Sequence, residues 1–181
     1  RFQKVVMSVQ GQGIIFDEGL EKNGNVVVVD GGYLTLDLIP FVGGRLISKG
    51  VYADHFGASR IVEDVQRSVI EMTGIDYTLQ EVNEMIRDGF VTSNGKKHDL
   101  TKAIERATNK YYEKFRATLK TRAGEYLARA DKVVIGGGLA YFLKNVSMPS
   151  NVVYSKKPEY ANVRGYFKIA GGVLWNRLDY T

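Results

Sequence analysis

The chain has 181 residues, of which 44% are hydrophobic, and carries a formal net charge of +5. No apolar run approaches the roughly 20 residues of a membrane-spanning helix, so we expect a cytoplasmic protein without a membrane partner. Cysteine is absent and the only histidines are His55 and His98, which excludes disulfides and thiolate zinc sites and leaves little for a histidine metal cluster. Any metal is therefore expected to be a hard cation bound by oxygen ligands.

The first fifty residues predict strands. Lys4–Val9 is a short apolar run, and Val26–Val29 is a run of four valines, which is typical of a strand buried on both faces. Leu34–Phe41 alternates between apolar and polar residues, and Arg45–Lys49 follows the Gly43-Gly44 turn. The last three of these strands are expected to form a meander.

Two helices are predicted next. Ser59 is expected to cap an amphipathic helix that ends at Gly74. A second helix begins with the capping box Thr78–Glu81 and ends at Gly89.

A hairpin over Phe90–Leu100 then leads into a long basic helix, Thr101 to about Arg129. Basic residues recur on this helix at intervals of four, at Lys102, Arg106, Lys110 and Lys114. We favour a solvated face for this stripe, because it has no aromatic platform on its own side. The alternatives are a face that contacts nucleotide or a filament neighbour, and direct binding of nucleic acid.

The last third of the chain alternates strands and helices. Lys132–Ile135 is predicted as a strand, followed by three glycines and a helix through Leu143. Asn151–Tyr154 is a further short strand, and Pro158 stands in the first turn of the last helix. The whole order predicts an α/β domain with a mixed sheet and helices on its faces.

The segment Asp30–Asp37 follows the valine strand and is the first candidate site. An acidic residue at the end of a buried strand is costly to desolvate unless a cation or hydrogen-bond donors meet it. Two carboxylates and the Thr35 hydroxyl around a tight turn suit a magnesium ion and its phosphate. The alternative is a plain hairpin in which Asp and Gly only supply turn chemistry.

The triple glycine Gly136–Gly138 is the second candidate site. It does not fit the dinucleotide-binding fingerprint, because Tyr141 stands where a third small residue is needed. Glycines between a strand and a helix still suit a nucleotide lying against the backbone. The alternative is a turn that only allows tight packing.

Four segments resemble motifs of the actin superfamily, most of all of the plasmid-segregating ParM/StbA group, and they occur along the chain in the family's order. Val29–Asp37 resembles the second phosphate loop, and Val133–Gly138 resembles the adenosine motif. Val5–Gly13 and Pro158–Gly165 are similar to the first and second connecting segments. The chain departs from the pattern at Val9, Gly31 and Leu34.

The resemblance implies a ribonuclease-H-like, actin-like ATPase domain with a mixed five-stranded sheet and flanking helices. It further implies a sheet core over residues 1–72 and 131–181, with a small inserted helical subdomain over about 73–130. The chain would be the second domain of a two-domain protein, and we expect the N-terminal domain, with the first phosphate loop, to be absent from it.

The resemblance also assigns roles. Asp30 would hold Mg²⁺ through water and help to place the attacking water, which Gln10 would orient. Asn162 would be structural at the hinge, through its own turn-forming amide. The nucleotide, ATP, would be contacted by Gly32, Tyr33, Thr35, Asp37, Gly57, Gly136, Gly137 and Gly138.

The implied function is an ATPase that polymerises with itself into filaments, for DNA or plasmid segregation or a cytoskeletal role, with a possible DNA-bound adaptor protein. Because nucleotide is clamped between two domains in this fold, we expect weak ATP binding and no measurable hydrolysis by this chain alone. The alternatives are the C-terminal domain of a sugar- or acetate-type kinase, and a basic nucleic-acid-binding module without catalysis.

Overall fold

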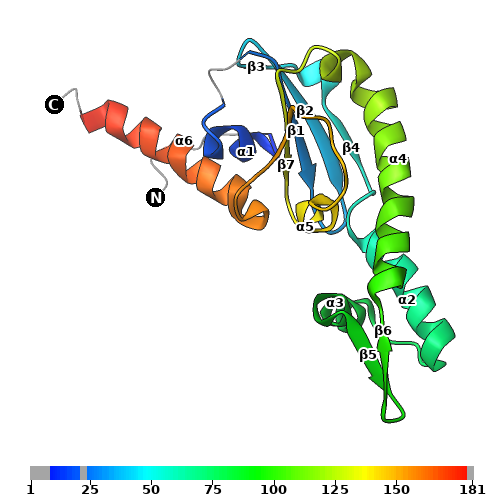
Figure 1. Ribbon diagram of the computed structural model, residues 1–181. Coiled ribbons are helices and arrows are strands. Elements are labelled where there is room, and N and C mark those ends of the chain that lie inside the picture. The colour runs from blue at the N-terminus through cyan, green and yellow to red at the C-terminus, as the bar shows by residue number, and fades with distance from the viewer. Residues whose placement is uncertain (1–8, 21–23, 179–181) are drawn as a thin grey trace.

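The computed structural model describes residues 9–20 and 24–178. A mixed β-sheet lies between two helical layers (Figure 1). One face is covered by α1 (Gln12–Asp17) and α6 (Ala161–Leu178). The other face is covered by α4 (Thr101–Leu127) and α5 (Leu139–Leu143), and α2 (Ser59–Thr73) extends from the end of the sheet alongside α4. Within the described ranges, no helix is long and apolar enough to cross a membrane.

The sheet has the strand order β3-β2-β1-β7-β8, and β4 also pairs with β2. β1 runs parallel to β7, and β7 parallel to β8, while β2 is antiparallel to β1, β3 and β4. The predicted mixed sheet is therefore confirmed, and within the described residues it has six strands where five were expected. The strands are β1 (Val26–Gly31), β2 (Leu36–Val42), β3 (Arg45–Leu46), β4 (Tyr52–Asp54), β7 (Lys132–Gly136) and β8 (Val152–Tyr154).

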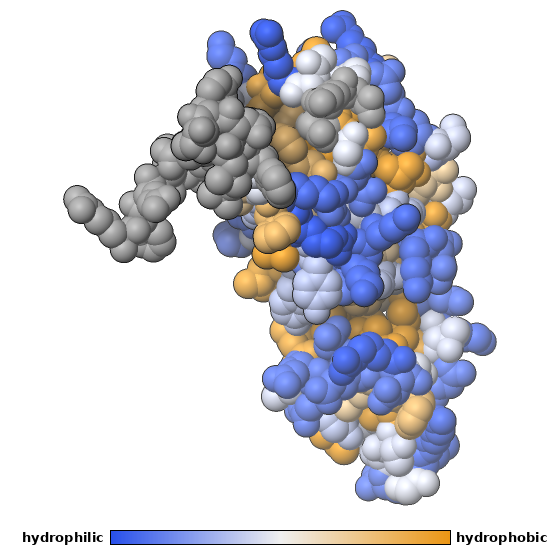
Figure 2. Space-filling model, turned by 90° about the vertical axis from the view of Figure 1, so that its left-hand side faces the viewer, coloured by the Kyte–Doolittle hydropathy of each residue, from blue (hydrophilic) through white to orange (hydrophobic). Residues whose placement is uncertain are grey.

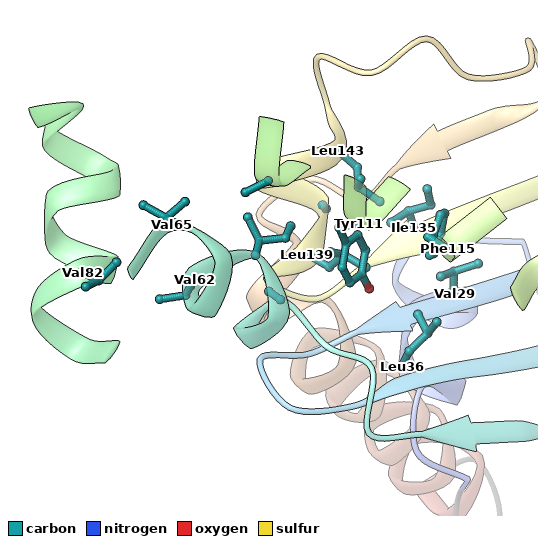
Figure 3. Packing of buried hydrophobic residues seen from close by; sticks show 14 of the residues in the cluster. Val29, Leu36, Val62, Val65, Val82, Tyr111, Phe115, Ile135, Leu139 and Leu143 are labelled. Atoms are coloured by element: carbon teal, nitrogen blue, oxygen red, sulfur yellow. The ribbon is translucent and has the colours of Figure 1, made fainter. Parts of the chain in front are cut away.

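The valine run lies at the centre of this sheet, as predicted. Val27 and Val29 point into the core under α2 and α4, whereas Val26 and Val28 point into the core under α1. All six residues of β1 are buried. In the larger core, Tyr111 and Phe115 of α4 lie over Val29 and Ile135 of the sheet (Figure 3). This two-sided burial explains why the strand carries no polar residue before Asp30.

A small lobe projects from one end of the sheet (Figure 1). It contains α3 (Leu79–Asp88) and the hairpin of β5 (Phe90–Ser93) and β6 (Lys96–Asp99). The predicted capping box of Thr78 and Glu81 is present at the start of α3. Val82 of α3 faces α2, which ties the lobe to the core (Figure 3).

Three sequence predictions about element ends need correction or fall outside the structure. Ser59 is not a helix cap: it is the first residue of α2, and its amide donates to the Tyr33 carbonyl instead. The predicted strand over Arg45–Lys49 ends at Leu46, since residues 48–50 form a 3₁₀ turn. The predicted strand Lys4–Val9 lies outside the described residues, apart from Val9. A second 3₁₀ turn, Pro158–Tyr160, precedes α6.

The two helices of the smaller layer, α1 and α6, touch through glycines. A Cβ atom added to Gly165 would lie 1.7 Å from the Gly13 carbonyl oxygen. Arg164 and Lys168 of α6 bind the carboxylate of Asp17 on α1, at 2.5 and 3.4 Å. Short helix α1 was not predicted from the sequence, and it is held mainly by these contacts with α6.

We predict that Gly165→Ala destabilises the chain by about 2 kcal/mol, because the added methyl overlaps the α1 backbone and forces the helices apart. Gly171→Ala is the matched control, since an added Cβ on this glycine of the same helix meets nothing within 4 Å. Chemical denaturation of both variants checks this. Equal stability of the two variants would contradict the close helix contact.

We also predict a pH-dependent loss of stability for Asp17→Asn. Burial alone would raise the pKa of Asp17, but hydrogen bonds and charges from Arg164 and Lys168 outweigh burial and lower it. The ion pairs therefore stabilise the chain above the unfolded pKa of about 4, and this contribution is lost as the pH falls through the lower folded pKa. Asp17→Asn should cost about 1 kcal/mol at pH 7 and progressively less toward pH 3. Unfolding curves at both pH values measure it, with Glu18→Gln as the neighbouring control.

Candidate functional site

Two buried carboxylates lie side by side where β1 ends. Asp30 and Asp37 are direct partners in the antiparallel register of β1 and β2, so both side chains lie on the same face of the sheet. They are 5% and 9% exposed. Burial raises the pKa of Asp30, and a hydrogen bond from Asn162 opposes this. Burial also raises the pKa of Asp37, the charge of Asp30 raises it further, and Thr35 opposes the rise.

This pair suits a hard cation. Among the described residues, neither carboxylate takes part in a salt bridge, and no group of three or more His, Cys, Asp or Glu side chains could hold a metal. Mg²⁺ is usually bound by one or two carboxylates and completed by phosphate and water oxygens. The donor set therefore fits Mg²⁺ that arrives with a phosphate, better than a cation held by protein ligands alone.

The turn between β1 and β2 is clamped by the start of α2. Amides of Gly57, Ala58 and Ser59 donate to the carbonyls of Leu34, Gly32 and Tyr33 at 2.8–3.0 Å. Gly57 is needed because an added Cβ would lie 2.4 Å from the Tyr33 carbonyl oxygen. Gly57 thus shapes this turn, and its approach to ribose or phosphate stays a prediction.

The three glycines after β7 meet the same end of β1. Parallel pairing sets Gly136 beside Asp30, and Gly136 packs against Ile14 of α1. Gly137 has a φ of +74°, and an added Cβ would lie 2.2 Å from the Gly31 carbonyl oxygen and 3.0 Å from Oδ1 of Asp30. Only glycine fits there. Asp30 and the triple glycine therefore converge at one edge of the sheet, where β1 and β7 end.

Gly138 lies at the edge of a cavity of about 820 Å³ between the sheet core and the lobe. An added Cβ on Gly138 meets nothing within 4 Å, so this position is open. Tyr33, 44% exposed, lines the same cavity and links it to the β1–β2 turn. Apolar atoms are exposed between the lobe and the larger part of the molecule in Figure 2.

The rest of the cavity wall was not anticipated. Sequence reasoning missed the polar residues that α3, α4 and the end of α5 contribute, because they are separated along the chain and carry no motif. The one available signal is that α4 places Glu105, Thr108 and Asn109 on one side of the helix. The polar residues concerned are Asn83, Arg87, Glu105, Thr108, Asn109, Tyr141, Lys144 and Asn145.

Gln10 lies in an exposed turn, two residues before α1 begins. Its neighbour Gly11 comes close to Asp30, since an added Cβ there would lie 3.2 Å from Cβ of Asp30. In the part of the chain that the structure describes, no hydrogen bond joins Gln10 to Asp30. The structure thus brings Gln10 near the carboxylates, and its role in orienting water stays a prediction.

Part of the basic stripe of α4 binds side chains of α2. Lys110 binds Asp64 of α2 at 3.0 Å, and Arg106 donates to the Ser68 hydroxyl of α2 at 3.2 Å. Lys114 borders a polar hollow that also contains Arg60, Glu63 and Arg67. Acidic and basic side chains alternate on this face, which reduces its attraction for a polyanion.

Comparison with solved structures supports the actin-type fold. A non-polymerisable quadruple mutant of pCBH ParM superposes with a TM-score of 0.80 at 18% identity, covering 92% of this chain and 54% of that one. The archaeal actin homologue Ta0583 gives 0.79 at 17% identity, with coverages of 93% and 55%. A 15-stranded ParM filament from Clostridium botulinum gives 0.79 at 18% identity, with coverages of 92% and 53%.

The chain therefore spans about half the length of these structures. No curated protein sequence matches it. Residues 28–147, more than half of the chain, match the family described as archaeal actin homologue MreB-like, C-terminal. This chain, with its mixed sheet, its Asp30 hairpin and its glycine turn, belongs to that family of actin homologues.

Proposed function

We propose that this chain forms one wall of a magnesium-nucleotide site in an actin-like, filament-forming ATPase. The observation that carries the proposal is the adjacency of two things: a buried pair of carboxylates, Asp30 and Asp37, and an open cavity bordered by Gly138 and Tyr33. Ligands of α/β proteins bind at the carboxyl ends of the strands, and both β1 and β7 end here.

In this proposal the cavity takes adenosine and the β1–β2 turn takes the phosphates. Glycines allow the backbone to approach the phosphates, and Thr35 adds a hydroxyl beside Asp37. Asp30 holds Mg²⁺ through water and, with Gln10, places the attacking water. Structures of relatives of the same fold contain ADP or AMPPNP, which supports nucleotide binding by this chain.

Filament formation is proposed from relatives too, since ParM and Alp12 structures of this fold are filaments. Segregation of DNA, and a DNA-bound adaptor, are proposed as the cellular use of the polymer. Because the chain spans about half of its structural relatives, we propose that hydrolysis requires the rest of a two-domain protein. The kinase and nucleic-acid alternatives have no observation of their own in this structure that favours them.

We predict that Gly138→Val weakens binding of ATP at least tenfold, because an added Cβ there meets nothing within 4 Å and the valine side chain would occupy the open edge of the cavity. NMR titration up to millimolar ATP suits the weak affinity expected of one half of a site. Gly124→Val on α4 is the matched control: an added Cβ there also meets nothing within 4 Å, and Gly124 does not line this cavity. Equal ATP affinities of the two variants would contradict the proposal that ATP binds in this cavity.

A second prediction concerns the carboxylate pair. Without divalent cations, Asp37→Asn should raise the free energy of unfolding by about 1 kcal/mol, because it removes a buried charge next to Asp30. Millimolar Mg²⁺ should stabilise the wild-type chain and not the variant. Thermal unfolding in EDTA and in Mg²⁺ measures both effects. Asp88→Asn is the control, because Asp88 is an exposed aspartate at the end of α3 and its variant should show neither effect. A loss of stability in Asp37→Asn in EDTA would contradict a destabilising interaction between Asp30 and Asp37.

A further inference from the structure

Asn162, near the start of α6, touches the carboxylate that the proposed site depends on. Its side-chain amide donates to Oδ2 of Asp30 at 2.6 Å, across 132 positions of the sequence. From the sequence we expected Asn162 to be structural at a hinge, through its own turn-forming amide. The structure corrects this expectation, because the amide reaches the end of β1.

The two carboxylate oxygens of Asp30 face different neighbours. Oδ2 takes the Asn162 hydrogen and lies on the side of Gly11, where an added Cβ would be 3.4 Å away. Oδ1 lies toward the glycine turn, 3.0 Å from the position of a Cβ on Gly137. With Oδ2 bound in this way, the carboxylate keeps Oδ1 directed to the edge where we place phosphate and cation.

The orientation of the Asn162 amide destabilises the folded chain, so a contribution to stability does not explain it. Its Oδ1 is buried and has no hydrogen-bond partner among the described residues. A buried acceptor without a partner costs about 1–3 kcal/mol. Turning the amide over would set this oxygen against the Asp30 carboxylate, so the donor side must face Asp30. Local costs of this kind are typical of functional sites.

The donor is also held firmly in place. Next to Asn162, Arg164 binds Asp17 of α1, and Gly165 contacts Gly13 backbone to backbone. Tyr166 donates to the Val9 carbonyl at 3.1 Å. These contacts fix the first turns of α6 against α1, so Asn162 cannot follow a free rotation of the Asp30 side chain.

We propose that Asn162 is a positioning residue: by binding Oδ2 of Asp30 from α6, it fixes the carboxylate so that Oδ1 serves the cation of a bound magnesium-nucleotide. This inference rests on the proposed function. It predicts that Asn162 matters for the cation-dependent part of nucleotide affinity and leaves the cation-independent part unchanged.

The experiment measures ATP affinity of the chain with EDTA and with Mg²⁺, for wild type, Asn162→Ala and Asn162→Leu. The leucine variant keeps the side-chain volume and removes the donor, so it guards against a cavity effect. In EDTA, we expect both variants to bind ATP with an affinity within twofold of that of wild type. In Mg²⁺, we expect both variants to bind ATP about tenfold more weakly than wild type does. Val163→Ala is the control, since Val163 is 64% exposed on the same helix turn.

A double-mutant cycle of Asn162→Ala with Asp30→Asn, read by unfolding without ligand, tests the contact independently of nucleotide. We expect strong non-additivity, because the first variant removes the donor and the second removes the charge it binds. Additive effects would overturn the inference, as would an equal loss of ATP affinity with and without Mg²⁺, which indicates a purely structural role. If wild type itself gains no affinity from Mg²⁺, the proposed function fails and the inference with it, whatever the cycle shows.

Discussion

The parallel pairing of β1 with β7 is the constraint on which the rest of the structure depends. It sets the last residue pair of the two strands, Asp30 and Gly136, next to each other, so that the turn after each strand begins at the same edge. The backbone of Gly137 then approaches Gly31 too closely for any side chain. Every element of the candidate site is arranged around this contact, including the hairpin that brings Asp37 back beside Asp30.

Burial on both faces is what makes the pairing stable, and it has an electrostatic consequence. The four valines of β1 are excluded from water on each side, and the strand ends with a carboxylate in the same environment. Desolvation of that carboxylate and of Asp37 opposes their ionisation. The fold tolerates this arrangement because the opposing hydrogen bonds from Asn162 and Thr35 stabilise the charged forms. A positive charge at this edge would stabilise them further.

The sequence predicted those parts of the molecule whose signals are local. The valine run, the capping box at Thr78 and the hairpin over Phe90–Leu100 each depend on a few neighbouring residues, and all three were located correctly. Strand β4 and helix α1 were not predicted, because each is short and is formed by contacts with distant elements. The helix cap assigned to Ser59 failed for a related reason: carbonyls of the β1–β2 turn, more than twenty positions earlier, bind the amides of Gly57, Ala58 and Ser59, and the helix already begins at Ser59.

The same distinction between local and long-range signals applies to the candidate site. Asp30, Asp37 and the glycines were found because strand ends and glycine-rich turns are visible in one segment. The contact of Asn162 with Asp30, and the polar residues of the cavity wall, join segments far apart in the chain and depend on the packing of α6 and of the lobe. Such pairings cannot be derived from one sequence without the fold.

Helix α4 links the two parts of the molecule mechanically. Its 27 residues span about 40 Å, and they run without a break from the lobe to the far end of the sheet. Ile104, Glu105, Thr108 and Asn109 near its start line the cavity, while Phe115 and Ala123 further along are buried in the sheet core. Because α4 is a stiff helix shared by both parts, it transmits force between them. A change in the width of the cavity on the lobe side must therefore tilt α4 or strain its packing against β1. A load applied to the lobe would therefore be transmitted to the strand that carries Asp30.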